Sequence, residues 1–175
     1  TKSVNVWNCF RYKVMAGNPN YPYYEMEMKE RGKLTAFGWT LTGHDELEPN
    51  APTNEARLRD MEIVGKDGYK TWASIEPVID FPSSLDMIAK ALAVGCKHFK
   101  IGLLTENTRV CRKRFKVEDC MGFITDVWNL TNGKATVYWK QSVRDLLGTV
   151  YTPAAVDEIL DQPNAVGKDW NMFDL

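Results

Sequence analysis

The chain has 175 residues and a mass of 20.0 kDa, with 44% hydrophobic and 26% charged residues. These values are typical of a single globular domain that is large enough to bury a substantial core. The 22 basic and 23 acidic side chains nearly cancel, which excludes a general electrostatic attraction to nucleic acid or anionic membranes. No apolar run approaches the roughly 18–20 residues of a membrane span, and no signal-peptide pattern opens the chain. We therefore expect a cytoplasmic protein that has no membrane partner.

The N-terminal part of the chain shows no regular hydrophobic periodicity. Residues 4–32 carry aromatic side chains among Asn and Pro, a composition that indicates a long loop. We expect one domain over residues 1–175. Within it, residues 1–33 form a strand end and loop, residues 34–148 form βα units, and residues 149–175 form a C-terminal helix and tail.

The first βα unit begins after this loop. Residues 34–41 are rich in aromatic and apolar side chains, which predicts a strand. Residues 50–52 open a helix with Pro52 in its first turn, where the missing N–H costs nothing. Apolar residues then recur at helical spacing, and glycines end the helix at residues 65–68. These apolar residues are Leu58, Met61 and Val64.

The second unit has the same order. Residues 71–79 predict a second strand. Ser83 and Asp86 have the spacing of a capping box, which indicates the start of a helix, and Gly95 stands where a C-terminal cap is expected. A third strand follows over residues 98–104.

The remaining elements continue this alternation. A third helix is predicted over residues 118–130 and a fourth strand over residues 135–139. A short helix over residues 142–147 and a further helix starting at Thr152 follow. Strands that start every 27–37 residues and alternate with helices predict an α/β fold with a parallel sheet, either doubly wound or part of a barrel.

Polar side chains stand at the carboxyl end of each predicted strand. In parallel α/β folds the active site lies at this edge of the sheet, so several strands that deliver polar groups there predict a pocket. His44 and Asp45 follow the first strand. The residues that we expect to line the pocket are Thr40, Thr42, Ser74, Glu76, Lys100, Lys140, Gln141 and Ser142.

Glu76 is the most distinctive of these residues. It lies between Ile75 and Pro77 in an apolar strand, and a buried carboxylate is costly unless it is paired. It therefore serves either as a proton-transfer group or hydrogen-bond acceptor for a ligand, or as the partner of Lys100 in a structural salt bridge. The residues alone leave both interpretations open.

Metal and nucleotide motifs are absent from the sequence. The cysteines at positions 9, 96, 111 and 120 form no C-x-x-C pair, and the two histidines are far apart. We therefore predict no metal site, and no phosphate-binding glycine motif occurs. The one basic run, residues 112–116, is interpreted either as a solvated loop or as a contact for phosphate or nucleic acid.

Several of these segments together resemble the second half of radical S-adenosylmethionine (SAM) enzymes. The similarity lies in T-L-T at residues 40–42, E-P-N-A-P-x-x-E-x-R-L at residues 48–58, and residues 68–77, which end in S-I-E-P. The opening residues 1–3 and the K-Q pair at residues 140–141 add weaker matches. The pattern is most similar to the spore-photoproduct-lyase-like branch and to phage-associated radical SAM-like proteins.

The resemblance implies a partial (βα) barrel, of which this chain holds about four to five parallel βα units. It also implies SAM as a cofactor, bound next to a [4Fe-4S] cluster on a C-x-x-x-C-x-x-C loop, and hydrogen abstraction by a 5′-deoxyadenosyl radical. This sequence contains no such cysteine loop, so a missing N-terminal segment would have to supply the cluster. By position, the resemblance assigns SAM contacts to Ser3, Thr40, Thr42 and Arg57, catalysis to Glu76 and Lys140, and substrate binding to Lys100 and Gln141.

Three functional hypotheses follow. In the first, the chain is the carboxyl-terminal half of a radical SAM-like enzyme, truncated or split, whose parent acts on an unidentified substrate such as a nucleic acid. In the second, it is a non-catalytic half-barrel that binds a partner or a second copy through its strand edges. In the third, it is a different small-molecule enzyme that uses Glu76 and Lys140 as acid and base.

Overall fold

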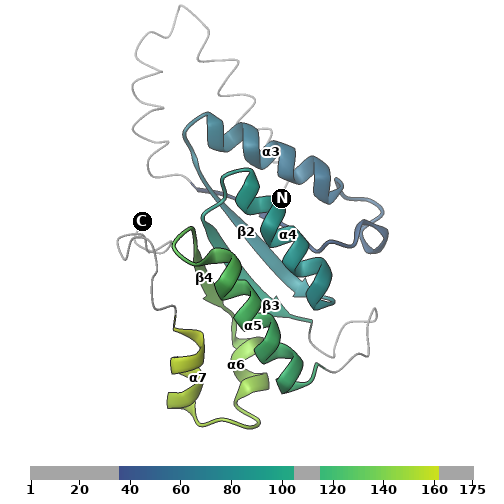
Figure 1. Cartoon of the computed structure of the whole chain (residues 1–175). Coiled ribbons are helices and arrows are strands. Elements are labelled where there is room, and N and C mark those ends of the chain that lie inside the picture. The colour runs from purple at the N-terminus through teal and green to yellow at the C-terminus, as the bar shows by residue number, and fades with distance from the viewer. Residues whose placement is uncertain (1–35, 105–114, 162–175) are drawn as a thin grey trace, which may run out of the picture.

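The computed structural model describes residues 36–104 and 115–161 (Figure 1). The centre of the fold is a sheet of four parallel strands in the spatial order β1-β2-β3-β4. The strands are β1 (Ala36–Thr40), β2 (Lys70–Val78), β3 (His98–Leu103) and β4 (Thr136–Trp139). The predicted α/β class with a parallel sheet is therefore confirmed.

Helices alternate with these strands along the chain. They are α3 (Asn54–Lys66), α4 (Phe81–Ala93) and α5 (Val117–Thr131). Helix α3 packs against β1 and β2, and α4 packs against β2, α3 and α5 (Figure 1). Since the strands follow one another in sequence order without a reversal, the three crossover helices share one face of the sheet.

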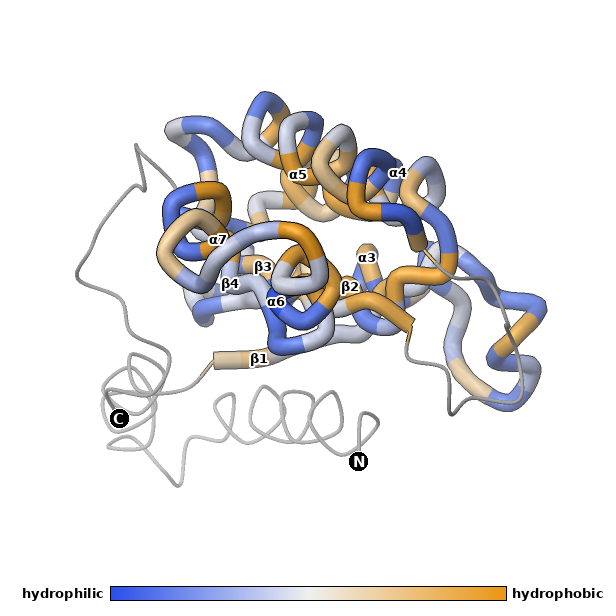
Figure 2. Tube along the Cα trace, turned by 90° about the horizontal axis from the view of Figure 1, so that it is seen from below, coloured by the Kyte–Doolittle hydropathy of each residue, from blue (hydrophilic) through white to orange (hydrophobic). Residues whose placement is uncertain are grey.

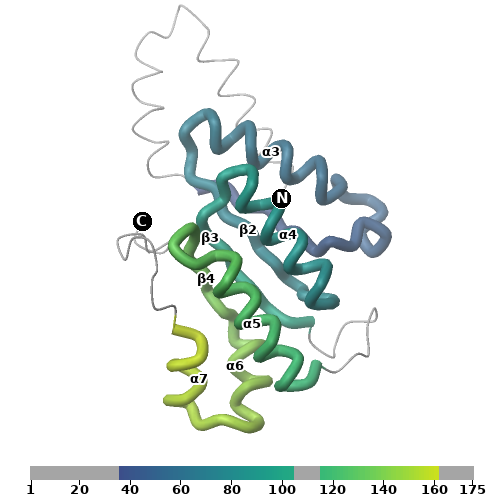
Figure 3. Tube along the Cα trace, in the orientation of Figure 1, coloured from purple at the N-terminus to yellow at the C-terminus, as the bar shows by residue number. Residues whose placement is uncertain are grey.

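Shorter helices complete the described part. A 3₁₀ turn, η1 (Asp45–Leu47), lies between β1 and α3. Helices α6 (Gln141–Leu147) and α7 (Pro153–Leu160) follow β4, and α6 contacts β3 (Figure 3). Among the described residues, no helix is both long and apolar enough to cross a bilayer.

The core fills the space between the sheet and the three helices (Figure 2). Successive strand residues point to opposite faces, so alternate positions of each strand enter this core. Phe37 and Trp39 of β1, Ala73 and Ile75 of β2, and Ile101 of β3 are buried here. Helix residues that complete the core include Met61, Ile88, Phe123, Ile124 and Val127.

The start of α3 lies later than predicted. Thr53 is the N-cap, because its hydroxyl accepts a hydrogen bond of 3.2 Å from the Ala56 amide, and the helix begins at Asn54. Pro52 therefore precedes the helix. The segment before it forms a turn in which the Ala51 amide donates to the Glu48 carbonyl, 2.9 Å away.

The start of α4 differs in the same way. The predicted capping box of Ser83 and Asp86 does not cap the helix. Asp80 is the N-cap, and its carboxylate accepts a hydrogen bond of 2.8 Å from the Ser83 amide. The predicted glycine ends are confirmed, since Gly68 and Gly95 take positive φ angles just beyond the ends of α3 and α4.

Candidate functional site

The face of the sheet opposite the helices carries the candidate site, and we call it the polar face. Its residues are Gly38, Thr40, Trp72, Ser74, Glu76, His98, Lys100, Gly102, Thr136 and Tyr138. Residues paired in the parallel register project to the same face, and alternate residues of each strand share a face, so these side chains lie on one side of the sheet. Of the polar groups expected at the carboxyl edge, Glu76 and Lys140 contact each other, whereas Lys100 lies over Trp72.

An aromatic ring and an ammonium group stack at the middle of the polar face. Trp72 pairs with Gly38 in the parallel register, and a Cβ at Gly38 would lie only 2.1 Å from the indole ring. The ring therefore lies against the backbone of β1, which only glycine permits. Lys100 Nζ lies 4.7 Å from the ring centroid, in cation–π range. Burial lowers the pKa of Lys100.

At the carboxyl edge of the same face, Glu76 and Lys140 form an ion pair through Glu76 Oε2 and Lys140 Nζ. Glu76 belongs to β2 and Lys140 follows β4, so the pair crosses over β3. Gly102 of β3 lies beneath it, where a Cβ would come within 2.9 Å of Glu76 Oε1. About a third of each charged side chain is exposed, so solvent can reach the pair.

The partner of Glu76 differs from the one weighed in the sequence. Its ion-pair partner in the structure is Lys140, whereas Lys100 lies over Trp72. One strand, β3, lies between the strands that carry Glu76 and Lys140, and the glycine at position 102 lets their side chains meet. The catalytic assignment of Glu76 and Lys140 stays a prediction, but the structure brings both groups together.

Ser142 holds the end of β3 next to this pair. Its hydroxyl oxygen accepts a hydrogen bond of 3.0 Å from the Leu103 amide and so fixes the start of α6 on β3. Gln141, predicted to bind substrate, is exposed and donates to Asp145 within α6 at 2.8 Å. The structure therefore does not bring Gln141 to the ion pair.

The turn after β1 is held by a partly buried hydrogen-bond network. The Thr42 amide donates to Asn54 Oδ1 at 3.1 Å, and the backbone amide and Nδ2 of Asn54 both donate to Asp45 Oδ1. The Thr42 hydroxyl accepts from the His44 amide at 3.2 Å. Thr42 is therefore part of the loop scaffold, and its predicted SAM contact stays a prediction.

Arg57 belongs to α3, and its guanidinium reaches the carboxyl end of β1. Only 3% of its side chain is exposed. Its Nη1 donates to the Thr40 carbonyl at 2.9 Å and lies 2.7 Å from Glu48 Oε2. Within the described ranges, Nη2 has no hydrogen-bond partner. The guanidinium therefore ties β1 to the loop that precedes α3.

His44 connects this loop to the start of α4. Its Nε2 lies 2.6 Å from Asp80 Oδ2, and its Nδ1 lies 2.7 Å from Glu46 Oε1. Burial alone would lower the pKa of His44, but the hydrogen bonds to Glu46 and Asp80 outweigh it and raise the pKa. The two carboxylates therefore stabilise the imidazolium form of His44 relative to that of a free histidine.

Sequence reasoning missed Gly38, Trp72, Gly102 and Tyr138. The available signal was an isolated glycine inside a strand pattern, which indicates a close approach by another group. Both Gly38 and Gly102 have this role. Ser3, residues 1–33 and most of the basic run lie outside the described residues.

The described residues do not fit an iron–sulfur cluster. None of their His, Cys, Asp and Glu side chains form a group that could hold a metal ion. Cys96 and Cys120 are buried, and burial raises the pKa of each thiol to about 11, so the thiolate that a metal requires is disfavoured. We therefore assign no reaction step to a cluster on this part of the chain.

Comparison with known proteins finds no relative of this chain. No protein-family model, no curated protein and no solved structure matches this chain. The class of protein that the fold defines is thus a parallel α/β protein with alternating strands and helices.

Proposed function

We propose that this chain is the carboxyl-terminal part of a radical SAM-like (βα) barrel and that its polar face contributes contacts to SAM and to the substrate. The supporting observation is the convergence of the Trp72–Lys100 stack and the Glu76–Lys140 pair on one face of a sheet whose strands follow in sequence order. The motifs at residues 40–42, 48–58 and 68–77 support the same family.

The strand order favours a barrel wall over a doubly wound sheet. A doubly wound sheet reverses its strand order at a switch point and carries helices on both faces. Here the order is sequential and α3, α4 and α5 share a face, as in a barrel that has its helices outside. The polar face would then line the barrel interior.

The side chains of the polar face suit the chemistry of SAM. Lys140 and Lys100 would attract the carboxylate of its methionine part, and Glu76 would accept hydrogen bonds from an amine or from ribose hydroxyls. The indole of Trp72 would contact the adenine. When bound to a reduced cluster, SAM supplies a 5′-deoxyadenosyl radical, and that cluster would have to come from another polypeptide segment.

Calorimetric titration of SAM into the purified chain tests this proposal. We expect saturable binding that Lys140→Met and Glu76→Gln each weaken about tenfold, which corresponds to about 1.4 kcal/mol. Lys90→Met is the matched control, because Lys90 lies on α4 and pairs with Asp86 at the helix surface. Binding that survives both polar-face variants would contradict the assigned roles.

A second candidate is a binding module that associates through its strand edges. Within the described ranges, β1 pairs with β2 alone and β4 pairs with β3 alone, so each outer strand has one unpaired edge. Unpaired edges are templates for a further strand from another chain. Sedimentation would then show a dimer, and SAM would cause no heat change.

A further inference from the structure

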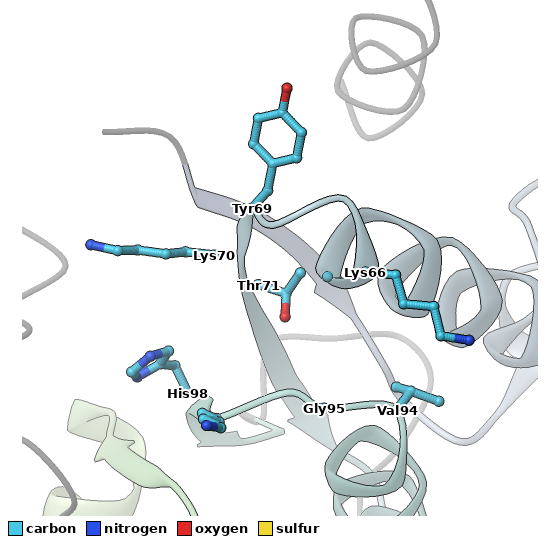
Figure 4. A pocket seen from close by; sticks show the side chains of 9 residues that line it. Lys66, Tyr69, Lys70, Thr71, Val94, Gly95 and His98 are labelled. Carbon is cyan, nitrogen blue, oxygen red and sulfur yellow. The ribbon is translucent and has the colours of Figure 1, made fainter. Parts of the chain in front are cut away.

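The described connections between strands and helices differ in length at the two edges of the sheet. At the amino edge, short segments lead from α3 through Tyr69 into β2 and from α4 through Gly95 into β3, beside a pocket (Figure 4). At the carboxyl edge, β1 leads into α3 through residues 41–53, which we call the β1–α3 loop, and β2 leads into α4 through residues 79–80. A loop as long as residues 41–53 keeps one position only through contacts with its neighbours.

The β1–α3 loop lies directly on the first turn of α4 at Gly43. A Cβ at this position would come within 3.0 Å of the Ser83 side chain and 3.2 Å of the Ser83 carbonyl oxygen. Gly43 also has a φ angle of 75°, which residues with a side chain adopt only with strain. This close fit brings the next residue, His44, beside Asp80, the N-cap of α4.

Both nitrogens of the His44 ring face a carboxylate. Nε2 lies 2.6 Å from Asp80 Oδ2, and Nδ1 lies 2.7 Å from Glu46 Oε1. A neutral imidazole has one N–H and can donate to only one of these oxygens, whereas the imidazolium ion donates to both. The bridge from Glu46 through His44 to Asp80 therefore requires a proton on each ring nitrogen.

The charged groups that act on this ring are acidic. Glu46 comes from the loop itself and Asp80 from the start of α4. Burial lowers the pKa of His44, but the hydrogen bonds and charges of these two carboxylates outweigh it and raise the pKa. Asp45, the neighbouring acidic residue, is turned toward Asn54, whose backbone amide and Nδ2 both donate to Asp45 Oδ1.

Loss of one ring proton affects the two contacts unequally. Glu46 has 67% of its side chain exposed against 27% for Asp80, so water replaces the ring more easily at Glu46. Asp80 also accepts hydrogen bonds from the Ser83 amide and hydroxyl, which keep its carboxylate beside Nε2. The neutral ring therefore keeps its proton on Nε2, toward Asp80. Nδ1 and the Glu46 carboxylate are then both acceptors, and they no longer attract each other.

We propose that His44 is a pH-sensitive switch that fixes the β1–α3 loop at the carboxyl edge of the sheet. In its protonated form the ring joins Glu46 of η1 to Asp80 at the start of α4. In its neutral form Glu46 is released, and the η1 turn opens more often. This switch is independent of the proposed SAM contacts, because none of its three residues belongs to the polar face.

Exchange of backbone amides with water, measured by NMR on the full chain, tests this proposal. The Leu47 amide donates to the His44 carbonyl and the Glu48 amide to the Asp45 carbonyl, so both report whether the η1 turn is closed. Of the two histidines, His44 alone titrates between about pH 6 and 9, because the pKa of His98 is about 4. After correction for the intrinsic exchange rate at each pH, we expect the protection of both amides to fall about two- to fivefold as the His44 ring loses its proton.

Glu46→Gln is the diagnostic variant. Its amide group can donate to the unprotonated Nδ1 while Nε2 still donates to Asp80, so the neutral ring keeps both partners. The protection of both amides should then stay constant through the titration. Glu62→Gln on α3, which changes the partner of Lys66, is the matched control and should respond as wild type does. The proposal is overturned if wild-type protection stays constant while His44 titrates, or if protection in Glu46→Gln falls as it does in wild type.

Discussion

Glu76 and Lys140 form an ion pair although 64 positions separate them in the sequence and strand β3 lies between their strands. Gly102 of β3 provides the space, because any larger residue would meet the Glu76 carboxylate. This arrangement joins three strands at the carboxyl edge of the sheet, which is the edge where parallel α/β proteins place their active sites.

A double-mutant cycle of Glu76→Gln and Lys140→Met should give a small coupling energy. Both side chains are about a third exposed, so we expect about 0.5 kcal/mol at low salt and less at high salt. Urea unfolding of the four proteins measures it. Glu76→Gln combined with Lys134→Met, at an exposed turn before β4, is the control and should show no coupling.

Three glycine substitutions should have different effects on the free energy of unfolding. Gly38→Ala should cost about 1–3 kcal/mol, because its Cβ meets the rigid indole of Trp72. Gly102→Ala should cost less than about 1 kcal/mol, since it meets the mobile ends of Glu76 and Lys140. Gly122→Ala on α5 meets nothing and should stabilise by about 0.5–1 kcal/mol. Equal costs at Gly38 and Gly102 would contradict the packing described above.

Arg57→Ala should destabilise the fold by about 2–3 kcal/mol. The change leaves Glu48 without its cation and the Thr40 carbonyl without its side-chain donor in a mostly buried site. Arg59→Ala is the matched control on the same helix, and because Arg59 is exposed it should change stability by less than about 0.5 kcal/mol. Thermal unfolding of both variants distinguishes the two cases.

The two histidines should give opposite dependences of stability on pH. Because the pKa of His44 is raised above 6.5 in the folded protein, protonated His44 stabilises the fold fully at pH values below 6.5. This stabilisation is lost as the pH rises through the pKa that His44 has in the folded protein. The pKa of folded His98, about 4, makes the protein less stable as the pH falls from 6.5, because the unfolded chain takes up the proton first.

Urea unfolding across pH 5–8 measures both effects. His44→Gln should flatten the loss of stability above pH 6.5, and His98→Asn should flatten the loss below it. The reverse assignment of these slopes would contradict the contacts of His44 with Asp80 and Glu46. It would also contradict the burial of His98 and the positive charges around it, which lower its pKa.

The sequence predicted the order and type of the main elements because the relevant signals are local. Apolar periodicity located α3 and β2 to within a few residues, and Thr152-Pro153 located the start of α7. The predicted starts of α3 and α4 were wrong, because the true N-caps, Thr53 and Asp80, lie within a few residues of other residues that can start a helix equally well. The choice between them depends on backbone conformation, which the residue types alone do not determine.

The candidate site was predictable only in part. Residues at the carboxyl ends of parallel strands meet at one edge, so the sequence brought Glu76 and Lys140 to the same place. It did not pair them, because that requires knowing that β3 separates their strands and that Gly102 leaves room. The Trp72–Gly38 contact also depends on strand register, which a single strand pattern does not reveal.

If SAM binds as proposed, it contacts the polar face of the sheet and not the helix-covered face. An amide and indole NMR map of the isotope-labelled chain during SAM titration distinguishes the two faces. We expect shifts of the Trp72 indole and of the Gly38 and Gly102 amides, with Gly122 of α5 unchanged. Shifts confined to the helix face, or a spectrum that SAM leaves unchanged, would contradict the proposed site.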